Sequence, residues 1–112
     1  MAEEYRVIIL PEAQRDIRET VLYIARELAS PLAALRLEEA LEAEIVSLSC
    51  MPKRVRTIDE QPWGKAGVRR TRVKNYYIYF LVDDGEKAVK VLAVIYSRRD
   101  QEEQLRTREI PE

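Results

Sequence analysis

The chain has no histidine and only one cysteine among its 112 residues, and these shortages restrict its chemistry. Without histidine, the side chains left to act as a general base are carboxylates, lysines and tyrosines. The single cysteine, Cys50, excludes an internal disulfide and has no metal-ligand spacing around it. Because Cys50 follows an apolar helical stretch, we interpret it as a small buried residue. We expect no metal and no cofactor.

Long apolar runs are also absent: none approaches the roughly 20 residues that span a bilayer. The N-terminal stretch MAEEYRVIIL begins with acidic residues and lacks a basic region, so we expect no signal peptide. With 46% apolar and 35% charged residues, the composition is that of an ordinary globular chain. Residues 1–112 are predicted to form a single domain in the cytoplasm, with no membrane association.

Charge of the two signs is unevenly distributed although the net charge is only −1. Residues 12–44 carry eight acids against four arginines. Residues 53–74 carry eight lysines and arginines against only Asp59 and Glu60. Such a basic segment is typical of an interaction surface, and equally of a strand edge whose charges discourage pairing with other chains. The charge pattern leaves both interpretations open.

The first half of the chain predicts one strand and two helices. Residues Tyr5–Leu10 are β-branched and apolar, and Pro11 suits the first turn of a helix. Apolar residues then recur at helical spacing along one face, at Ile17, Val21, Ile24 and Leu28.

A second helix is predicted to begin at Ser30 and Pro31, as N-cap and first helical residue. Its predicted inner face is formed by Leu37, Leu41, Ile45 and Leu48. With almost no linker between them, the two helices should form an antiparallel hairpin.

The second half of the chain predicts three strands. A long segment without sustained periodicity, residues 51–66, precedes strand candidates at 67–75, 76–84 and 88–97. Asn75 suits a tight turn, and Asp84-Gly85 is a strong hairpin signal. The polar tail 100–112 is predicted to form one helical turn followed by disorder. The fold class is α+β, in the order β-α-α-β-β-β, with an antiparallel-dominated sheet and the helical hairpin on one face.

Both faces of the last two predicted strands are apolar, which is typical of strands that are covered on both sides. Alternation places Ile78 and Phe80 opposite Tyr77 and Tyr79. In the last strand it groups Val89, Val91, Ala93 and Ile95 on one face. One helical hairpin covers one face, so the other face must be covered by the chain itself, by a partner or by a second copy of the chain.

Three segments together resemble the RelE/ParE superfamily of bacterial toxins: EAQRDIRETVLYI, GVRRTRVKNYYIYFLVDD and VKVLAVIYSRRDQ. The resemblance covers almost the whole chain through the order and spacing of these segments. It implies a small cytoplasmic toxin of a type II toxin–antitoxin pair, neutralised by a cognate antitoxin that wraps around it in a hetero-oligomer. Such an antitoxin would cover the second apolar face.

The resemblance leaves the target open, because RelE-like members cut mRNA in the ribosome whereas ParE-like members act on DNA gyrase. The strand lysines of the RelE pattern fall near Arg70 and Arg72, and its final-strand arginine falls on Arg98 or Arg99. An arginine of that pattern falls on Tyr77, and its C-terminal tyrosine has no counterpart in the tail. With two expected groups missing, the resemblance is nearer to the ParE-like branch.

The available side chains agree with binding better than with catalysis. In the cleavage of RNA, an arginine can stabilise the negative charge of the phosphorane, but it does not accept a proton near neutral pH. We therefore assign no catalytic residue and leave open whether the chain is an enzyme. A ribosome-dependent endoribonuclease would use Arg70, Arg72, Arg98 and Arg99. Partner binding is expected at Arg69, Arg70, Arg72, Tyr77, Tyr79, Tyr96, Arg98 and Arg99.

An inert interaction module remains a third class. Trp63, in the long segment before the strands, is either packed on the core or exposed as a contact, and we favour packing.

Overall fold

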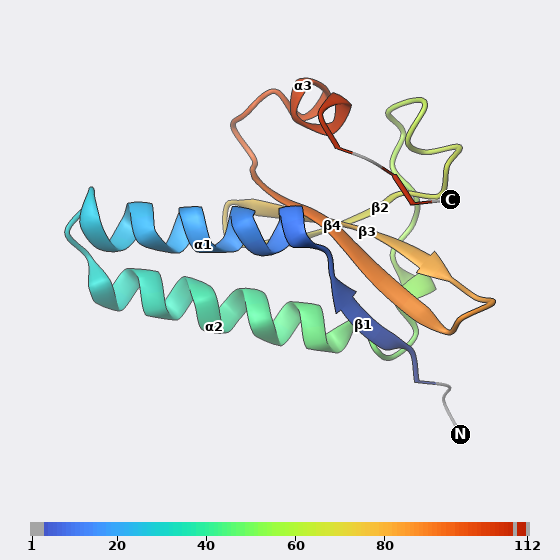
Figure 1. Cartoon of the computed structure of the whole chain (residues 1–112), viewed down its shortest axis with the longest axis horizontal. Helices are drawn as coiled ribbons and strands as arrows, with labels where there is room; N and C mark the ends of the chain where they lie inside the picture. Colours follow the sequence, from blue (N-terminus) through green and yellow to red (C-terminus); the bar gives the residue numbers. More distant parts are fainter. Residues whose placement is uncertain (1–3, 109, 112) are drawn as a thin grey trace.

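The computed structural model describes residues 4–108, 110 and 111, and in it a helical hairpin lies against a four-stranded sheet (Figure 1). The elements in chain order are β1 (Arg6–Ile9), α1 (Pro11–Arg26), α2 (Pro31–Ser47), β2 (Arg69–Val73), β3 (Tyr76–Asp83), β4 (Ala88–Tyr96) and α3 (Gln101–Arg106). A short 3-10 turn at Pro52–Arg54 interrupts the long segment between α2 and β2. The predicted α+β class and the order β-α-α-β-β-β are confirmed.

The strand order across the sheet is β1-β4-β3-β2. Strands β2, β3 and β4 form the antiparallel meander expected from the two turn signals. Lys74 and Asn75 form the first turn, and Lys74 has a φ of 52° there. Strand β1 joins at the edge and runs parallel to β4, with Arg6 opposite Ala88.

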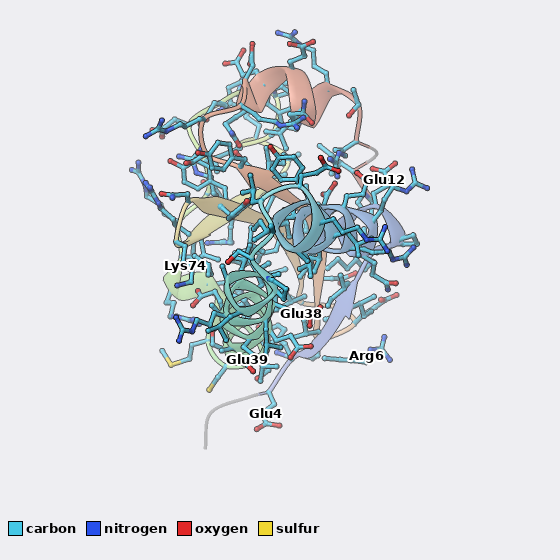
Figure 2. All side chains as sticks on the ribbon, turned by 90° about the vertical axis from the view of Figure 1, so that its left-hand side faces the viewer. Glu4, Arg6, Glu12, Glu38, Glu39 and Lys74 are labelled. Carbon is cyan, nitrogen blue, oxygen red and sulfur yellow. The ribbon has the colours of Figure 1, made fainter. Side chains whose placement is uncertain are left out.

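The hairpin buries its apolar face against one side of the sheet. All four residues predicted for the inner face of α2 are buried: Leu37, Leu41, Ile45 and Leu48. They share a core with Ile78 and Phe80 of β3. Figure 2 shows the two helices end-on. The prediction for Leu28 is wrong: α1 ends at Arg26, and Leu28 is 57% exposed in the connection between the helices.

The other side of the sheet is covered by the chain itself. The segment that precedes β2 contributes three buried residues to a second core, Ile58, Trp63 and Val68. They pack there with Leu105 of α3. The preferred interpretation of Trp63 as a packed side chain is therefore confirmed, since it is 6% exposed. The helical turn predicted in the tail beyond residue 100 is present as α3, and α3 and Ile110 pack on this core.

A β-bulge at Leu92 changes which residues of β4 share a face. Tyr79 pairs with Ala93, but Phe80 pairs with Val91, so Leu92 is an extra residue in the ladder. Val91 therefore faces the hairpin, while Leu92 and Ala93 both contribute to the second core. The prediction that Val91 and Ala93 share a face is wrong, because strict alternation does not hold through a bulge.

Cys50 is exposed, so its interpretation as a buried residue is wrong. It lies just beyond α2, where it forms an isolated bridge with Glu4 outside the core. Among the described residues, no helix is long and apolar enough to cross a membrane.

Candidate functional site

Arg70 is the centre of a cationic cluster on the side of the sheet that carries the second core. It lies on β2 opposite Tyr79, and Arg72 lies opposite Tyr77, so the four side chains share a face. The Arg70 guanidinium carbon is 4.3 Å from the centre of the Tyr77 ring, and that of Arg72 is 5.7 Å from it. Two guanidinium groups therefore share one aromatic ring, within the range of cation–π attraction.

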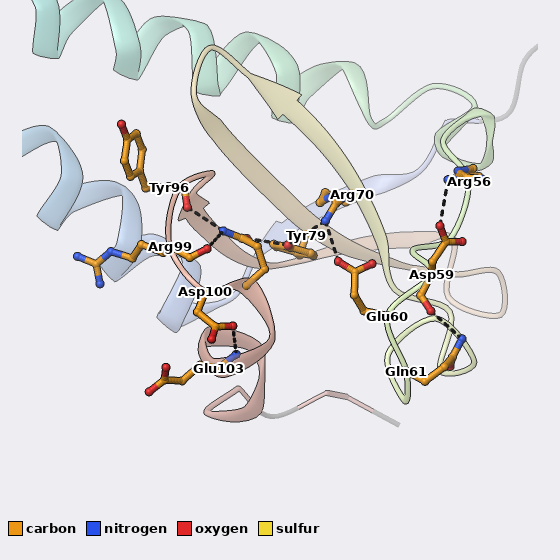
Figure 3. Close-up of polar contacts among 11 residues, drawn as sticks. Arg56, Asp59, Glu60, Gln61, Arg70, Tyr79, Tyr96, Arg99, Asp100 and Glu103 are labelled. Atoms are coloured by element: carbon orange, nitrogen blue, oxygen red, sulfur yellow. Dashed lines mark hydrogen bonds and ion pairs between the residues drawn. The ribbon is translucent and has the colours of Figure 1, made fainter.

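Glu60 reaches the same cluster from the segment before β2. Nη1 of Arg70 donates to Oε2 of Glu60 over 3.1 Å and to the hydroxyl of Tyr79 over 3.4 Å (Figure 3). The Tyr79 hydroxyl in turn donates to Oε1 of Gln101 over 2.8 Å. The cluster therefore joins β2, β3, α3 and the preceding segment by side-chain contacts.

The protonation of the cluster suits binding rather than proton transfer. Burial, the largest effect, acts to lower the pKa of Arg70, but the interactions with Tyr79, Glu60 and Tyr77 together outweigh it and the pKa lies above its ordinary value. Burial also raises the pKa of Tyr79, against the opposing influence of Arg70. Near neutral pH the arginine is thus charged and the phenol neutral, and neither is a ready proton acceptor.

The arginine next to this cluster has a different environment. Arg69 points to the opposite side from Arg70, as neighbours on a strand do, and its Nη1 donates to the carbonyl of Val55. Its Nε is buried without a hydrogen-bond partner among the described atoms. Arg69 therefore fastens the segment before β2 rather than joining the cluster around Arg70.

The predicted residues at the end of β4 lie on the hairpin side of the sheet. The rings of Tyr96 and Tyr76 are 5.4 Å apart between their centres. With Arg99, and with Tyr23 of α1, they line a groove of about 780 Å³. Burial raises the pKa of Tyr76, while the positive charge of Arg99 acts to lower it.

The sequence-predicted site is thus divided between the two faces of the sheet. Arg70, Arg72 and Tyr77 lie together on one face, while Tyr96 and Arg99 lie on the other. Arg98 is exposed, and its side chain makes no hydrogen bond or ion pair within the described part of the chain. Tyr79 was expected on an accessible surface, but it has no exposed area.

Several residues of these sites were not anticipated. Glu60 and Gln101 complete the cluster around Arg70, and Asp16 and Arg108 line the groove on the hairpin side. For Glu60 a signal existed, because it is one of only two acids in the basic segment. The others lie far from their partners along the sequence, which leaves no local pattern to read.

Comparison with known proteins identifies the family. The family model described as "ParE toxin of type II toxin-antitoxin system, parDE" matches residues 7–101. The chain belongs to the ParE toxin family. This match confirms the resemblance to the RelE/ParE superfamily, and it makes the chain a toxin of the type II class. No curated protein matches the chain in sequence.

Solved structures of related toxins share the fold of this ParE family member. A chain of the chromosomal ParDE toxin–antitoxin system from P. aeruginosa matches with a TM-score of 0.68 and 15% identity, over 85% of this chain and 98% of that one. A chain of the toxin–antitoxin complex RelBE2 from Mycobacterium tuberculosis gives 0.63 and 21%, over 83% and 91%. A mutant of the E. coli toxin RelE in the free state gives 0.58 and 14%, over 93% of each chain.

Proposed function

We propose that this ParE family toxin is neutralised by a cognate antitoxin and acts by binding DNA gyrase in the cytoplasm. The alternative is a ribosome-dependent mRNA endonuclease. The observation that carries the proposal is the chemical character of the cluster around Arg70. Arg70 and Arg72 are permanent cations, and the phenol of Tyr79, whose pKa is raised further by burial, is neutral near pH 7. Among the described residues, the carboxylate in contact with Arg70 is that of Glu60, and it is paired. These groups favour attachment to an acidic partner over cleavage of RNA.

An antitoxin partner is supported by the relatives and by an accessible groove. The P. aeruginosa and M. tuberculosis structures come from toxin–antitoxin systems. In this chain, the groove between α1 and the ends of β3 and β4 is bordered by Tyr23, which is 56% exposed, and by Leu28. Arg99 lines the same groove. We propose that an antitoxin segment with apolar and acidic side chains binds there, forming a toxin–antitoxin hetero-oligomer.

The test of the target compares two purified systems. The protein is added to gyrase with supercoiled DNA and, separately, to translating ribosomes with an mRNA. We expect stalled or poisoned gyrase and intact mRNA. Codon-specific cleavage of the mRNA with gyrase unaffected would establish the nuclease alternative, and inactivity in both systems would leave an inert interaction module.

Substitution of the arginines distinguishes binding from catalysis in the same assays. Arg70→Ala, Arg72→Ala and Arg99→Ala should each weaken inhibition about tenfold to a hundredfold, and a higher protein concentration should restore it. Loss of a transition-state contact would instead lower the rate at every concentration. Arg106→Ala is the matched control, because within the described residues Arg106 pairs only with Glu102, on the exposed surface of α3.

A further inference from the structure

Arg70 holds Glu60 by a single contact. One guanidinium nitrogen, Nη1, lies 3.1 Å from one carboxylate oxygen, and the structure gives no second contact between the two groups. The pair formed by Arg108 and Asp16 differs, because its two nitrogens meet two oxygens at 2.7 and 3.0 Å. A guanidinium engaged at one nitrogen retains N–H donors for another anion.

The side chain of Arg70 is partly accessible. Its side chain is 29% exposed, and the neighbouring Arg72 is exposed as well. Arg72 is oriented by its own contact, since its Nε donates to the carbonyl of Lys74 over 2.8 Å. Both guanidiniums lie within 6 Å of the Tyr77 ring, at 4.3 and 5.7 Å. Two oriented cations beside one ring suit a planar carboxylate, which takes paired hydrogen bonds.

Glu60 is one of the few carboxylates in the basic segment, where the positive charges would otherwise repel one another. The basic segment contains two acids, Asp59 and Glu60, against eight cations. Asp59 contacts Arg56 in a pair whose side chains are more than four-fifths exposed, at 83% and 84%. Glu60 is instead 26% exposed and directed at Arg70 (Figure 3). It thus has the chemistry and the position that an incoming acidic side chain would need.

The turn that carries Glu60 also carries Trp63. The carbonyl of Glu60 accepts from the backbone N–H of Gly64 over 2.9 Å, which closes the turn around the tryptophan. Trp63 is buried in the second core beneath this turn. Glu60 and Trp63 therefore belong to one hydrogen-bonded turn over that core.

We propose that Arg70, Arg72 and Tyr77 form a site for an acidic side chain of a protein partner, and that Glu60 is its internal competitor. The inference rests on the proposed function in that the toxin's partner supplies the acidic side chain. When the partner's carboxylate takes the free donors of the two arginines, Glu60 leaves and its turn moves with it. Binding at the cluster then uncovers apolar surface, including Trp63, for further contact.

The experiment uses a capped hexaglutamate peptide as the probe and the full chain as the protein. Its affinity is measured for the unaltered protein, for Glu60→Gln and for Asp59→Asn, which makes the same charge change one residue away. We expect Glu60→Gln to bind the peptide about fivefold more tightly than Asp59→Asn, because the competitor is removed from the site. Equal affinities for the two variants would overturn the proposal, since only the net charge would then matter.

A second measurement needs no substitution. The chain contains one tryptophan, so acrylamide quenching of its fluorescence reports on Trp63 alone. In the unaltered protein, quenching should increase as the peptide binds, with the same midpoint as binding. Binding without any change at Trp63 would overturn the displacement of the turn. Arg70→Ala should abolish the response and Arg56→Ala should retain it; the reverse result would also overturn the proposal.

A third arm of the experiment distinguishes an acidic protein partner from a nucleic acid. A hexauridylate oligonucleotide replaces the peptide, and a gain in Glu60→Gln for the oligonucleotide without one for the peptide would overturn the assignment to a protein. None of these assays contains gyrase or antitoxin. Failure to inhibit gyrase would therefore remove the proposed target and leave the competition by Glu60 standing, whereas loss of competition would leave the gyrase result standing.

Discussion

Asp16 and Arg108 form a two-contact ion pair although 92 positions separate them in the sequence. Nη1 and Nη2 of Arg108 donate to the two carboxylate oxygens of Asp16 over 2.7 and 3.0 Å. The same carboxylate accepts the backbone N–H of Val94, two residues after the bulge, over 2.9 Å. The Asp16 side chain of α1 therefore contacts both the bulged part of β4, through Val94, and the segment after α3, through Arg108.

Loss of this pair should destabilise the fold. The two side chains are only 12% and 14% exposed, so Arg108→Ala leaves a largely buried carboxylate without its cation. We expect the free energy of unfolding to fall by about 3 kcal/mol. Urea denaturation measures this change. Arg106→Ala is the control: it removes an exposed ion pair within α3 and should change the free energy of unfolding by less than about 0.5 kcal/mol. Equal effects of the two substitutions would show that the pair does not hold the C-terminal segment.

Alkaline pH should weaken the fold partly through Tyr79. Burial raises its pKa in the folded state above its value in the unfolded chain, near 10. The unfolded chain therefore loses this proton first, so the contribution of Tyr79 is fully present below about pH 10 and is lost as the pH rises through the folded-state value.

Tyr79→Phe tests this pH dependence. At neutral pH the free energy of unfolding of the variant should be about 1 kcal/mol lower, because the hydrogen bonds of the hydroxyl to Arg70 and Gln101 are lost. Its stability should then decline less steeply above about pH 10 than that of the unaltered protein, in urea unfolding at a series of pH values. Part of the decline should persist through Tyr76, whose pKa is raised as well. Parallel pH profiles for the two proteins would contradict the assignment to Tyr79.

Gly64 should be irreplaceable for a steric reason. A Cβ atom at this position would lie 2.2 Å from the carbonyl oxygen of Ile58, which is backbone and cannot swing aside. We expect Gly64→Ala to cost at least about 2 kcal/mol and to expose Trp63. Gly85→Ala is the control, since the nearest atom there is Oδ1 of Asp83 at 3.4 Å. Similar unfolding midpoints for the two variants would mean that the turn adjusts freely.

The exposed Cys50 predicts rapid chemical labelling. A thiol reagent added to the folded protein should modify one equivalent at a rate close to that in denaturant, because Cys50 lies outside the core. A labelled protein that keeps its unfolding midpoint would agree with this position. Protection that disappears only on unfolding would support the buried thiol expected from the sequence.

Regular patterns made most of the fold predictable. Helical spacing identified the inner face of α2, and Pro11 and Pro31 mark the first residues of the two long helices. Turn residues separated the three strands of the meander correctly. The pattern failed at Leu28 and Leu92, where an apolar residue follows the spacing but the backbone has already left the helix or bulged from the ladder. Apolarity alone does not report such departures.

The candidate site was predictable in composition but not in arrangement. Arg70, Arg72 and Tyr77 were named as binding residues, and they do lie together. The burial of Tyr79 was not foreseen, because it depends on how the preceding segment and α3 cover β3. Such long-range contacts join residues that share no local pattern, as Glu60 and Arg70 illustrate.

The parallel pairing of β1 with β4 has a consequence for the timing of folding. Arg6 pairs with Ala88 and Asp16 with Arg108, so β1 gains its partner strand, and α1 its ion pair, only after β4 and the segment beyond α3 have been synthesised. Contacts between such distant segments carry a large loop-closure entropy and slow folding. Until β4 has been synthesised the nascent chain lacks its complete sheet, and a shortened product that ends before β4 lacks both the partner strand of β1 and the β4 side of the groove.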